Sequence, residues 1–374
     1  MRLALQLIFG IFSFDSKNMR WFNLKRIVIS FFILPIFLLI LFVNRLFLAL
    51  DYIFFPGFKK LQIKNPVFIV AAPRSGTTFL YHSLCNNKEA FTFFKLWEIV
   101  FAPSIIQKYF YLFIFYLDRL IGSPIKKIIL FIEQLLIGRI SKIHLIGLDL
   151  PEEDEAILLW NLSTIYLNFF YSDSHFFDNL FEFDEMKDSK KKKQILNFYK
   201  KCILRHNFVF NRNSDKQFLS KNPALMSKVE SLKVIFPDAK ILNINRCISK
   251  TIPSTLELNH NLYALFTSRL TPIQVDERTI LYLVKWYKMA NDNLEKYFKD
   301  SYLKIDFKKM TSNSTEELKI IYQFLKLTEG KRIVELVQEV KTEHKSSNKY
   351  EVLSDERTSL ILTEIPFMAN YSEK

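Results

Sequence analysis

The sequence predicts an α/β fold, a parallel sheet flanked by helices, with a hydrophobic membrane-anchor helix near the N-terminus. Short strand patterns alternate with longer helical patterns, which is typical of a parallel sheet covered on both faces. A run without charge occupies residues 27–44, and a loop of small residues, AAPRSGTT, occupies residues 71–78. A chain of 374 residues fits one large domain with an appendage. We expect an anchor and connector over residues 1–60 and one folded domain over residues 61–374.

The anchor is expected from the run IVISFFILPIFLLILFVN at residues 27–44, after which the apolar character resumes as LFLAL. A helix needs about 20 apolar residues to cross a bilayer, so the run is just long enough, and Pro35 would kink it. A hydrophobic hairpin or an interfacial helix within one leaflet is the alternative. A cleaved signal peptide fits less well, because the run starts late and lacks a small-residue cleavage site.

Basic residues lie on both sides of the apolar run, so their distribution does not decide its orientation. We expect a membrane-associated protein with its main domain in the cytoplasm.

The remaining elements follow from the apolar patterns. Strands are expected at 67–72, 217–223, 240–245 and 302–307, and helices at 105–140, 224–236, 277–299 and 316–327. A further helical region covers 152–210 with a polar break near 172–191, and FFPGFKK at 54–60 is a turn-rich connector. Charges such as Asp118, Lys126 and Glu133 within 105–140 favour amphipathic packing, or contact with a membrane surface, over a second span.

The loop at residues 71–78 is P-loop-like in its position between a strand and a helix. The Walker A pattern G-x-x-x-x-G-K-[ST] puts Ala71 at its first glycine and Thr77 at its lysine, so two diagnostic residues fail. Without that lysine, hydrolysis of ATP is disfavoured.

The same loop can still bind an anion. Backbone N–H groups of residues 75–78 lie at the expected helix N-terminus, and Gly76 permits a close backbone approach. Arg74 adds a planar charged fork suited to phosphate or sulfate oxygens. Further donors are the hydroxyls of Ser75, Thr77 and Thr78. A tight turn with a surface arginine is the alternative interpretation.

A second anion-binding pair follows a later strand pattern. KILNIN at 240–245 ends at Arg246, and Ser254 comes eight residues later. An arginine at the carboxyl end of a parallel strand lies on the edge where α/β sheets bind ligands. Both elements are therefore expected to open onto the same edge.

The formal net charge of +14 suits an anionic ligand, a nucleic acid or an anionic membrane surface. Three cysteines without metal-type spacing indicate neither a disulfide framework nor a zinc site. We expect no metal and no nucleic-acid partner.

Together these residues resemble the nucleotide-binding elements of sulfotransferases that use 3′-phosphoadenosine 5′-phosphosulfate (PAPS). The resemblance continues in order over about residues 50–330, through FTFFKLWEIVFAPSI (91–105), IHLIGLDLPEEDE (143–155) and FLSKNPALMSKVESL (218–232). The chain is most similar to the bacterial-type, membrane-associated branch. This implies a sulfotransferase domain over residues 61–374, with PAPS as the sulfuryl donor.

In that family the first loop holds the 5′-phosphosulfate, and the arginine–serine pair holds the 3′-phosphate. The resemblance thus implies that the sulfate end contacts Arg74, Ser75, Gly76, Thr77 and Thr78. It implies that the 3′-phosphate contacts Arg246 and Ser254.

Sulfuryl transfer needs cations around the sulfate oxygens, a stabilised leaving phosphate and a base for the acceptor proton. Arg74 supplies the first cation. Lys221 in SKNP resembles a lysine of the tyrosylprotein branch that reaches the bridging oxygen, and Glu98 in KLWEIV resembles the catalytic glutamate of that branch. Burial beside Trp97 would raise the pKa of Glu98, whereas nearby cations would lower it. Outside the resemblance, an exposed lysine and a surface glutamate are the simpler interpretations.

Other residues are rivals for the base. His82 lies one helical turn after the loop and could be a base or a phosphosulfate contact, although a lone helix histidine more often packs. His144 is a candidate by its order in the chain, because the soluble branch uses a histidine downstream of its loop. The acidic run at 152–155 either caps the next helix or places Glu152 or Glu153 in the site.

The expected function is sulfuryl transfer from PAPS to a hydroxyl or amine of a lipid, a glycan or another small acceptor. One alternative is a P-loop small-molecule kinase, and a second is a non-catalytic membrane protein with a nucleotide-binding fold. Binding of adenosine 3′,5′-bisphosphate would separate the first function from the other two.

Overall fold

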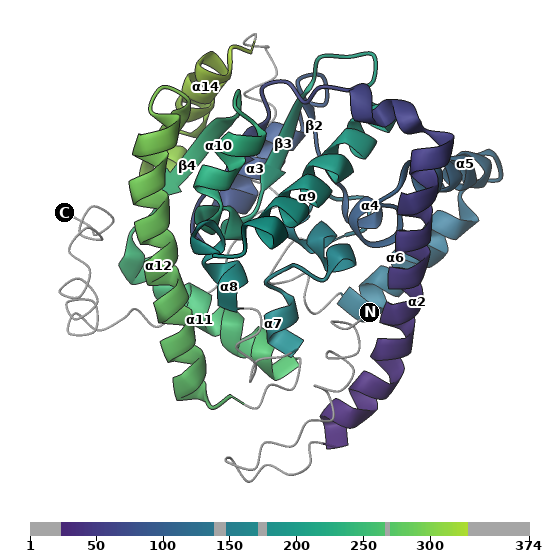
Figure 1. Ribbon diagram of the computed structural model, residues 1–374, viewed down its shortest axis with the longest axis horizontal. Helices are drawn as coiled ribbons and strands as arrows, with labels where there is room; N and C mark the ends of the chain where they lie inside the picture. The colour runs from purple at the N-terminus through teal and green to yellow at the C-terminus, as the bar shows by residue number, and fades with distance from the viewer. Residues whose placement is uncertain (1–23, 138–146, 171–177, 266–269, 328–374) are drawn as a thin grey trace.

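A five-stranded parallel sheet forms the centre of the molecule (Figure 1). The computed structural model describes residues 24–137, 147–170, 178–265 and 270–327. The sheet order is β2-β3-β1-β4-β5, and every pairing is parallel. The strands are β1 (Val67–Ile69), β2 (Phe91–Thr92), β3 (Gln217–Lys221), β4 (Lys240–Asn245) and β5 (Tyr302–Asp306). The predicted fold class is confirmed, although β2, with two residues, is too short to leave a strand pattern in the sequence.

Side chains of β1 alternate between two hydrophobic cores. Phe68 packs into a core on one face of the sheet, whereas Val67 and Ile69 pack into a second core on the other face. A strand that is buried on both faces has a continuous apolar sequence, which is why VFIV predicts a central strand. The helices that bury the two faces are α3 (Thr77–Cys85), α9 (Ser189–Phe210), α10 (Val229–Ile235), α11 (Ile248–Leu265), α12 (Pro272–Phe298), α13 (Phe307–Ser312) and α14 (Ser314–Leu325).

The helix predicted at 224–236 is divided. Pro223–Ser227 forms a 3-10 turn, η5, and α10 begins only at Val229. The side chain of Asn222 accepts from the Ala224 amide, which starts the turn, and Lys228 between the two pieces has non-helical backbone angles. The Lys228 ammonium forms an ion pair with Glu155 at 2.5 Å. The break in the helix therefore places a buried lysine beside the acidic run at residues 152–155.

The acidic run at residues 152–155 leads into a set of short helices that precede α9. These are η2 (Asp154–Asn161), α7 (Leu167–Phe170), α8 (Asp178–Phe181) and η4 (Phe183–Glu185).

The N-terminal helix is longer than the uncharged run from which it was predicted. Helix α2 spans Leu24–Phe54 and is followed by the 3-10 turn η1 (Pro56–Lys60). Its segment Phe31–Phe54 is long and apolar enough to cross a membrane, by length and composition. Beside it lie α4 (Leu96–Phe101), α5 (Ile105–Leu120) and α6 (Pro124–Ile137), on one side of the molecule in Figure 1.

Polar contacts join the second half of α2 to the rest of the protein. The Asn44 amide donates to the Val100 carbonyl at 3.0 Å, and Asp51 forms a buried ion pair with Arg205 of α9 at 2.8 Å. Asp51 also accepts from the amides of Ile105 and Ile106 at the start of α5. Asn44 and Asp51 of this apolar helix therefore lie on the face that meets the folded domain.

Candidate active site

The loop after β1 is folded as a tight turn between a strand and a helix. Arg74 and Gly76 both have positive φ, at 64° and 82°, and Gly76 caps the N-terminus of α3. This geometry turns the chain sharply from strand into helix, so the first amides of α3 have no partner within their own helix. Ser75 is buried, and its hydroxyl oxygen has no hydrogen-bond partner among the described residues.

The two predicted anion-binding elements are in direct contact. Arg246 follows β4, and its Nη1 donates to the backbone carbonyl of Arg74 at 2.5 Å. In return, Arg74 Nε donates to the hydroxyl of Ser254, on α11, at 2.8 Å. The guanidinium of Arg246 also lies over the ring of Phe307, 4.2 Å from its centroid. The sequence prediction that both elements share one edge of the sheet is confirmed in geometry.

Lys221 ends β3, the strand on the other side of β1. It pairs with Ile69 in the sheet register, so its backbone lies beside the start of the loop. Its ammonium is buried and contacts Glu153 at 2.6 Å, and Tyr166 donates to the second oxygen of Glu153 at 2.7 Å. The carboxyl edge therefore carries Arg246, the loop and Lys221 on three adjacent strands.

Glu152 and Glu153 are held at this edge by an isolated bridge between Lys95 and Pro151. The Glu152 amide donates to the carbonyl of Phe94, just beyond β2. Burial, together with the charge of Glu153, raises the pKa of Glu152 to about 7, against the lowering effect of Lys221. A carboxyl group with this pKa exchanges its proton near neutral pH.

Comparison with known proteins agrees with this geometry. The model of the sulfotransferase family matches residues 66–329, more than two thirds of the chain. The chain belongs to the sulfotransferase family. Its coordinates are similar to those of sulfotransferase STF9 from Mycobacterium avium, at 16% identity with a TM-score of 0.70, covering 90% of this chain and 84% of that one.

A second similar structure is sulfotransferase STF1 from Mycobacterium tuberculosis H37Rv, at 13% identity with a TM-score of 0.67, covering 97% of this chain and 90% of that one. No curated protein matches the chain in sequence. At these identities the structures support the fold, and the family match supports a sulfotransfer reaction.

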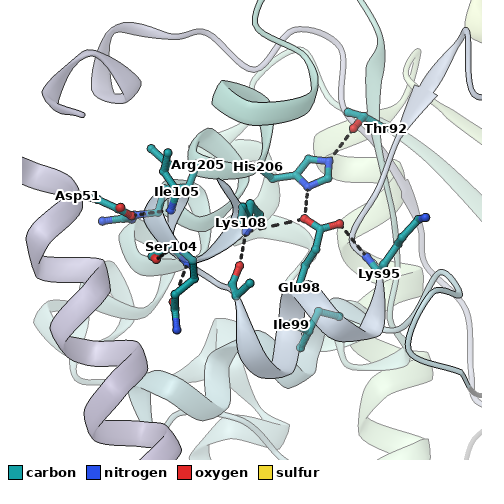
Figure 2. Close-up of polar contacts among 12 residues, drawn as sticks. Asp51, Thr92, Lys95, Glu98, Ile99, Ser104, Ile105, Lys108, Arg205 and His206 are labelled. Atoms are coloured by element: carbon teal, nitrogen blue, oxygen red, sulfur yellow. Dashed lines mark hydrogen bonds and ion pairs between the residues drawn. The ribbon is translucent and has the colours of Figure 1, made fainter. Parts of the chain in front are cut away.

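In this sulfotransferase, Glu98 lies on α4, in a buried polar cluster that includes Thr92 of β2 (Figure 2). One carboxylate oxygen accepts from His206 Nδ1 at 2.8 Å and lies 3.7 Å from the Lys108 ammonium. The other oxygen accepts from the backbone amide of Lys95 at 3.2 Å. His206 Nε2 in turn contacts the hydroxyl of Thr92 at 2.6 Å. Both oxygens of Glu98 are therefore engaged within the protein.

Burial of Glu98 favours its neutral form, but the charge and hydrogen bond of His206, with the charge of Lys108, outweigh it, and its pKa is lowered. The pKa of Lys108 is also lowered, chiefly by its own burial, against the charge of Glu98. The effect of neighbouring groups on the pKa of Glu98 thus outweighs that of burial. These groups are Lys108 of α5 and His206 of α9, and not Arg74 or Lys221.

His82 is buried on α3, with its ring edge-on to Tyr81 at 6.1 Å between centroids. Thr77 is buried and Thr78 is partly exposed at the first turn of that helix. His144 lies outside the described residues. Among the residues that the structure describes, no group of His, Cys, Asp and Glu side chains is placed to hold a metal ion.

Two contacts of the site were not anticipated from the sequence. Phe307, directly after β5, covers both Arg246 and Gly76, and Glu153 holds Lys221. The sequence shows that Phe307 follows a strand pattern and that Glu153 follows a proline, but it does not predict what either residue contacts. The contacts follow from the strand order, which puts β5 on one side of the loop and β3 on the other.

Gly76 provides a prediction, because it combines a positive φ with a close contact. A Cβ at this position would lie 2.4 Å from Cε2 of Phe307, so Gly76→Ala must displace that ring and strain the turn. We expect the free energy of unfolding to fall by roughly 1–3 kcal/mol, as for other overpacked sites, with weakened binding of adenosine 3′,5′-bisphosphate.

Gly122→Ala is the matched control for Gly76→Ala, since Gly122 has φ of 85° but no atom within 4 Å of an added Cβ. Urea unfolding and calorimetry measure both effects. Equal losses of stability in the two variants would show that the Phe307 contact has no part in the effect.

Proposed function

We propose that this sulfotransferase transfers a sulfuryl group from PAPS to a hydroxyl or amine of a lipid, a glycan or another small acceptor. The observation that carries the proposal is a hydrogen bond of 2.5 Å from Arg246 Nη1 to the backbone carbonyl of Arg74. It joins the two proposed anion-binding elements. A ligand with one anionic group at each end would be held across this junction. PAPS has a phosphosulfate at one end and a 3′-phosphate at the other.

The residues present fit that donor. The hydroxyl of Ser75 is buried without a hydrogen-bond partner among the described residues, and it lies at the N-terminus of α3, where a helix favours an anion. Arg74 with the amides of residues 75–78 would hold the sulfate end. Arg246 and Ser254 would hold the 3′-phosphate, since the Ser254 hydroxyl accepts from Arg74 and keeps its own proton to donate.

When bound, PAPS supplies a sulfuryl group on a phosphate that leaves. Lys221 would stabilise the negative charge that develops on the bridging oxygen, because the strand that carries it adjoins the loop. Glu153 and Tyr166 hold this lysine in place through the 2.6 Å ion pair and the bond that supports it.

The acceptor proton needs a base, and two carboxylates are proposed for this role. Glu98 is the candidate from the sequence resemblance, but both of its oxygens are engaged and its pKa is lowered. Glu152 lies on the carboxyl edge and has a pKa of about 7, which suits a base at neutral pH. The geometry thus supports Glu152 as the base and Glu98 as a positioning residue, and His82 stays a prediction.

The acceptor side of the site adjoins apolar structure, which supports an acceptor with an apolar part. Trp97 of α4 packs against Tyr111 and Phe115 of α5, with ring centroids 6.0 and 5.6 Å apart. The backbone of Trp97 bonds to Leu148 O, in the segment that leads to Glu152. We propose a membrane-associated enzyme, anchored through α2, with its main domain in the cytoplasm.

The donor can be tested without knowing the acceptor. Calorimetry with the full chain in detergent should show that adenosine 3′,5′-bisphosphate binds more tightly than ATP. Labelled PAPS added to membranes of cells that express the protein should transfer label to a lipid or glycan fraction. Preference for ATP would favour a kinase, and absence of binding by either nucleotide would favour a non-catalytic protein.

Glu152 makes the rate depend on pH in a defined direction. A base must be deprotonated, so kcat/KM should rise with pH through about 7, the pKa of Glu152, and level off above it. Glu152→Gln should lower the rate by roughly 10²–10⁴-fold and remove this rise. A Glu152→Gln variant that keeps both the rate and the pH profile of the natural protein would rule Glu152 out as the base.

A further inference from the structure

Within the described residues, most large apolar side chains that are exposed lie on one side of the protein. In the described part of the chain, the large apolar residues that are exposed lie on α2, α5, α6 and the α5–α6 turn. The exceptions are Val234, Ile273, Leu281 and Ile320. Figure 1 places α2, α5 and α6 together, on the side away from α10 and α12. Contiguous apolar surface of this extent marks an interaction site.

The first part of α2 indicates what covers this surface. Between Phe31 and Val43 the helix has no charged residue and is apolar all round. Phe37, Ile40 and Leu41 pack partly against the domain, and the other side of the helix is exposed. A helix that is apolar on every face needs an apolar medium on every face. The domain covers part of one face, and lipid would cover all of the apolar surface that the domain leaves exposed. Helix α2 therefore places a bilayer beside the helices that pack on it.

Helix α5 is fixed to α2 and exposes the same kind of surface. Asp51 of α2 accepts from the first amides of α5, and Gln107 of α5 donates to Asn44 of α2 at 2.7 Å. Charged residues leave most of the exposed face of α5 uninterrupted, because Lys108 and Asp118 are buried and the exposed Arg119 lies in the last turn. The exposed face consists of Tyr109, Phe110, Phe113, Phe115, Tyr116, Leu117 and Leu120.

Helix α6 extends the surface and closes its edge with positive charge. Asp118 accepts from the amides of Ile125 and Lys126, which fixes the turn between α5 and α6. Exposed apolar residues continue along α6 to Ile132. At the turn, Arg119, Lys126 and Lys127 are exposed, where they can meet anionic lipid headgroups.

We propose that α5 and α6 form a second membrane-binding element, which lies in the plane of one leaflet of an anionic bilayer beside the anchor α2. With 16 and 14 residues, these helices are shorter than the roughly 20 residues that a span requires, so they lie within the leaflet instead of crossing it. Exposed tyrosines at 109 and 116 suit the interface between headgroups and acyl chains. The inference concerns membrane contact alone and does not depend on the proposed reaction.

Nitroxide labels on the full chain test the contact position by position. Phe113→Cys on α5 and Phe131→Cys on α6 label sites that are 58% and 67% exposed. Leu39→Cys on α2 is the lipid reference, and Val234→Cys on α10, 71% exposed, is the matched water reference. A Cys247→Ala background removes the one native cysteine of the chain that is not buried. Circular dichroism confirms that each labelled protein is folded.

The proteins are reconstituted in phosphatidylcholine vesicles containing phosphatidylglycerol, and relaxation by oxygen is compared with relaxation by a water-soluble nickel chelate. We expect labels at 113 and 131 to follow the label at 39, with an oxygen-to-chelate ratio several-fold above that at 234. Labels at 113 and 131 that behave like the label at 234, while the label at 39 reports lipid, would overturn the proposal. Labels shielded from both agents, with spin–spin broadening between chains, would overturn it in favour of contact between copies of the protein.

Discussion

Replacing Arg246 with alanine is expected to weaken the binding of adenosine 3′,5′-bisphosphate by about 10–100-fold. Arg246 is proposed to hold the 3′-phosphate, and a hydrogen bond to a charged group contributes about 1.5–3 kcal/mol. A loss of about 1.4 kcal/mol is a tenfold change in affinity, which gives the expected range. The side chain also bonds to the Arg74 carbonyl at 2.5 Å, so the variant can act in two ways.

A comparison of ligands separates these two effects of Arg246→Ala. Adenosine 5′-phosphate lacks the 3′-phosphate, so its affinity should change little if Arg246 acts on that group. Equal weakening of both ligands in calorimetry would assign the effect to the loop. Unchanged affinity for the bisphosphate would contradict the assignment of Arg246 altogether. Arg212→Ala, at an exposed arginine after α9, controls for the loss of one positive charge.

The sequence predicts well that the two proposed anion-binding elements lie on one edge of the sheet, and the reason is local. Arg74 and Arg246 each follow a buried strand, and in a parallel sheet all such positions fall on one edge. No long-range contact has to be known for that conclusion. Lys221 is predictable by the same argument, because it ends β3.

The surroundings of Glu98 are less predictable, because its contacts join distant parts of the chain. His206 is 108 residues from Glu98, and no periodicity in either segment relates α9 to α4. In the sequence, Glu98 is therefore a glutamate beside a tryptophan, and its burial in an ionic cluster is visible only in the fold. The same holds for Asp51, which ends an apolar run in the sequence but is an internal ion-pair partner of Arg205 in the structure.

Glu98→Gln is expected to lower the free energy of unfolding by about 3–5 kcal/mol, as for other broken buried ion pairs. Lys108 is fully buried, and in the variant its ammonium would lose the negative charge beside it and keep its hydrogen bond to the Ala102 carbonyl, 2.6 Å away. Adding Lys108→Met removes that charge and keeps a side chain of similar size against Phe94. We expect the double variant to recover most of the stability in urea unfolding.

Turnover in the same double variant distinguishes the two roles considered for Glu98. A positioning residue supports α4 and its cap at Lys95, so turnover should return together with stability. A base is lost with its carboxylate, so a stable double variant would stay inactive. We expect turnover to return, because both oxygens of Glu98 are engaged inside the protein. A folded double variant that binds adenosine 3′,5′-bisphosphate normally but transfers nothing would restore Glu98 as the base and remove Glu152 from that role.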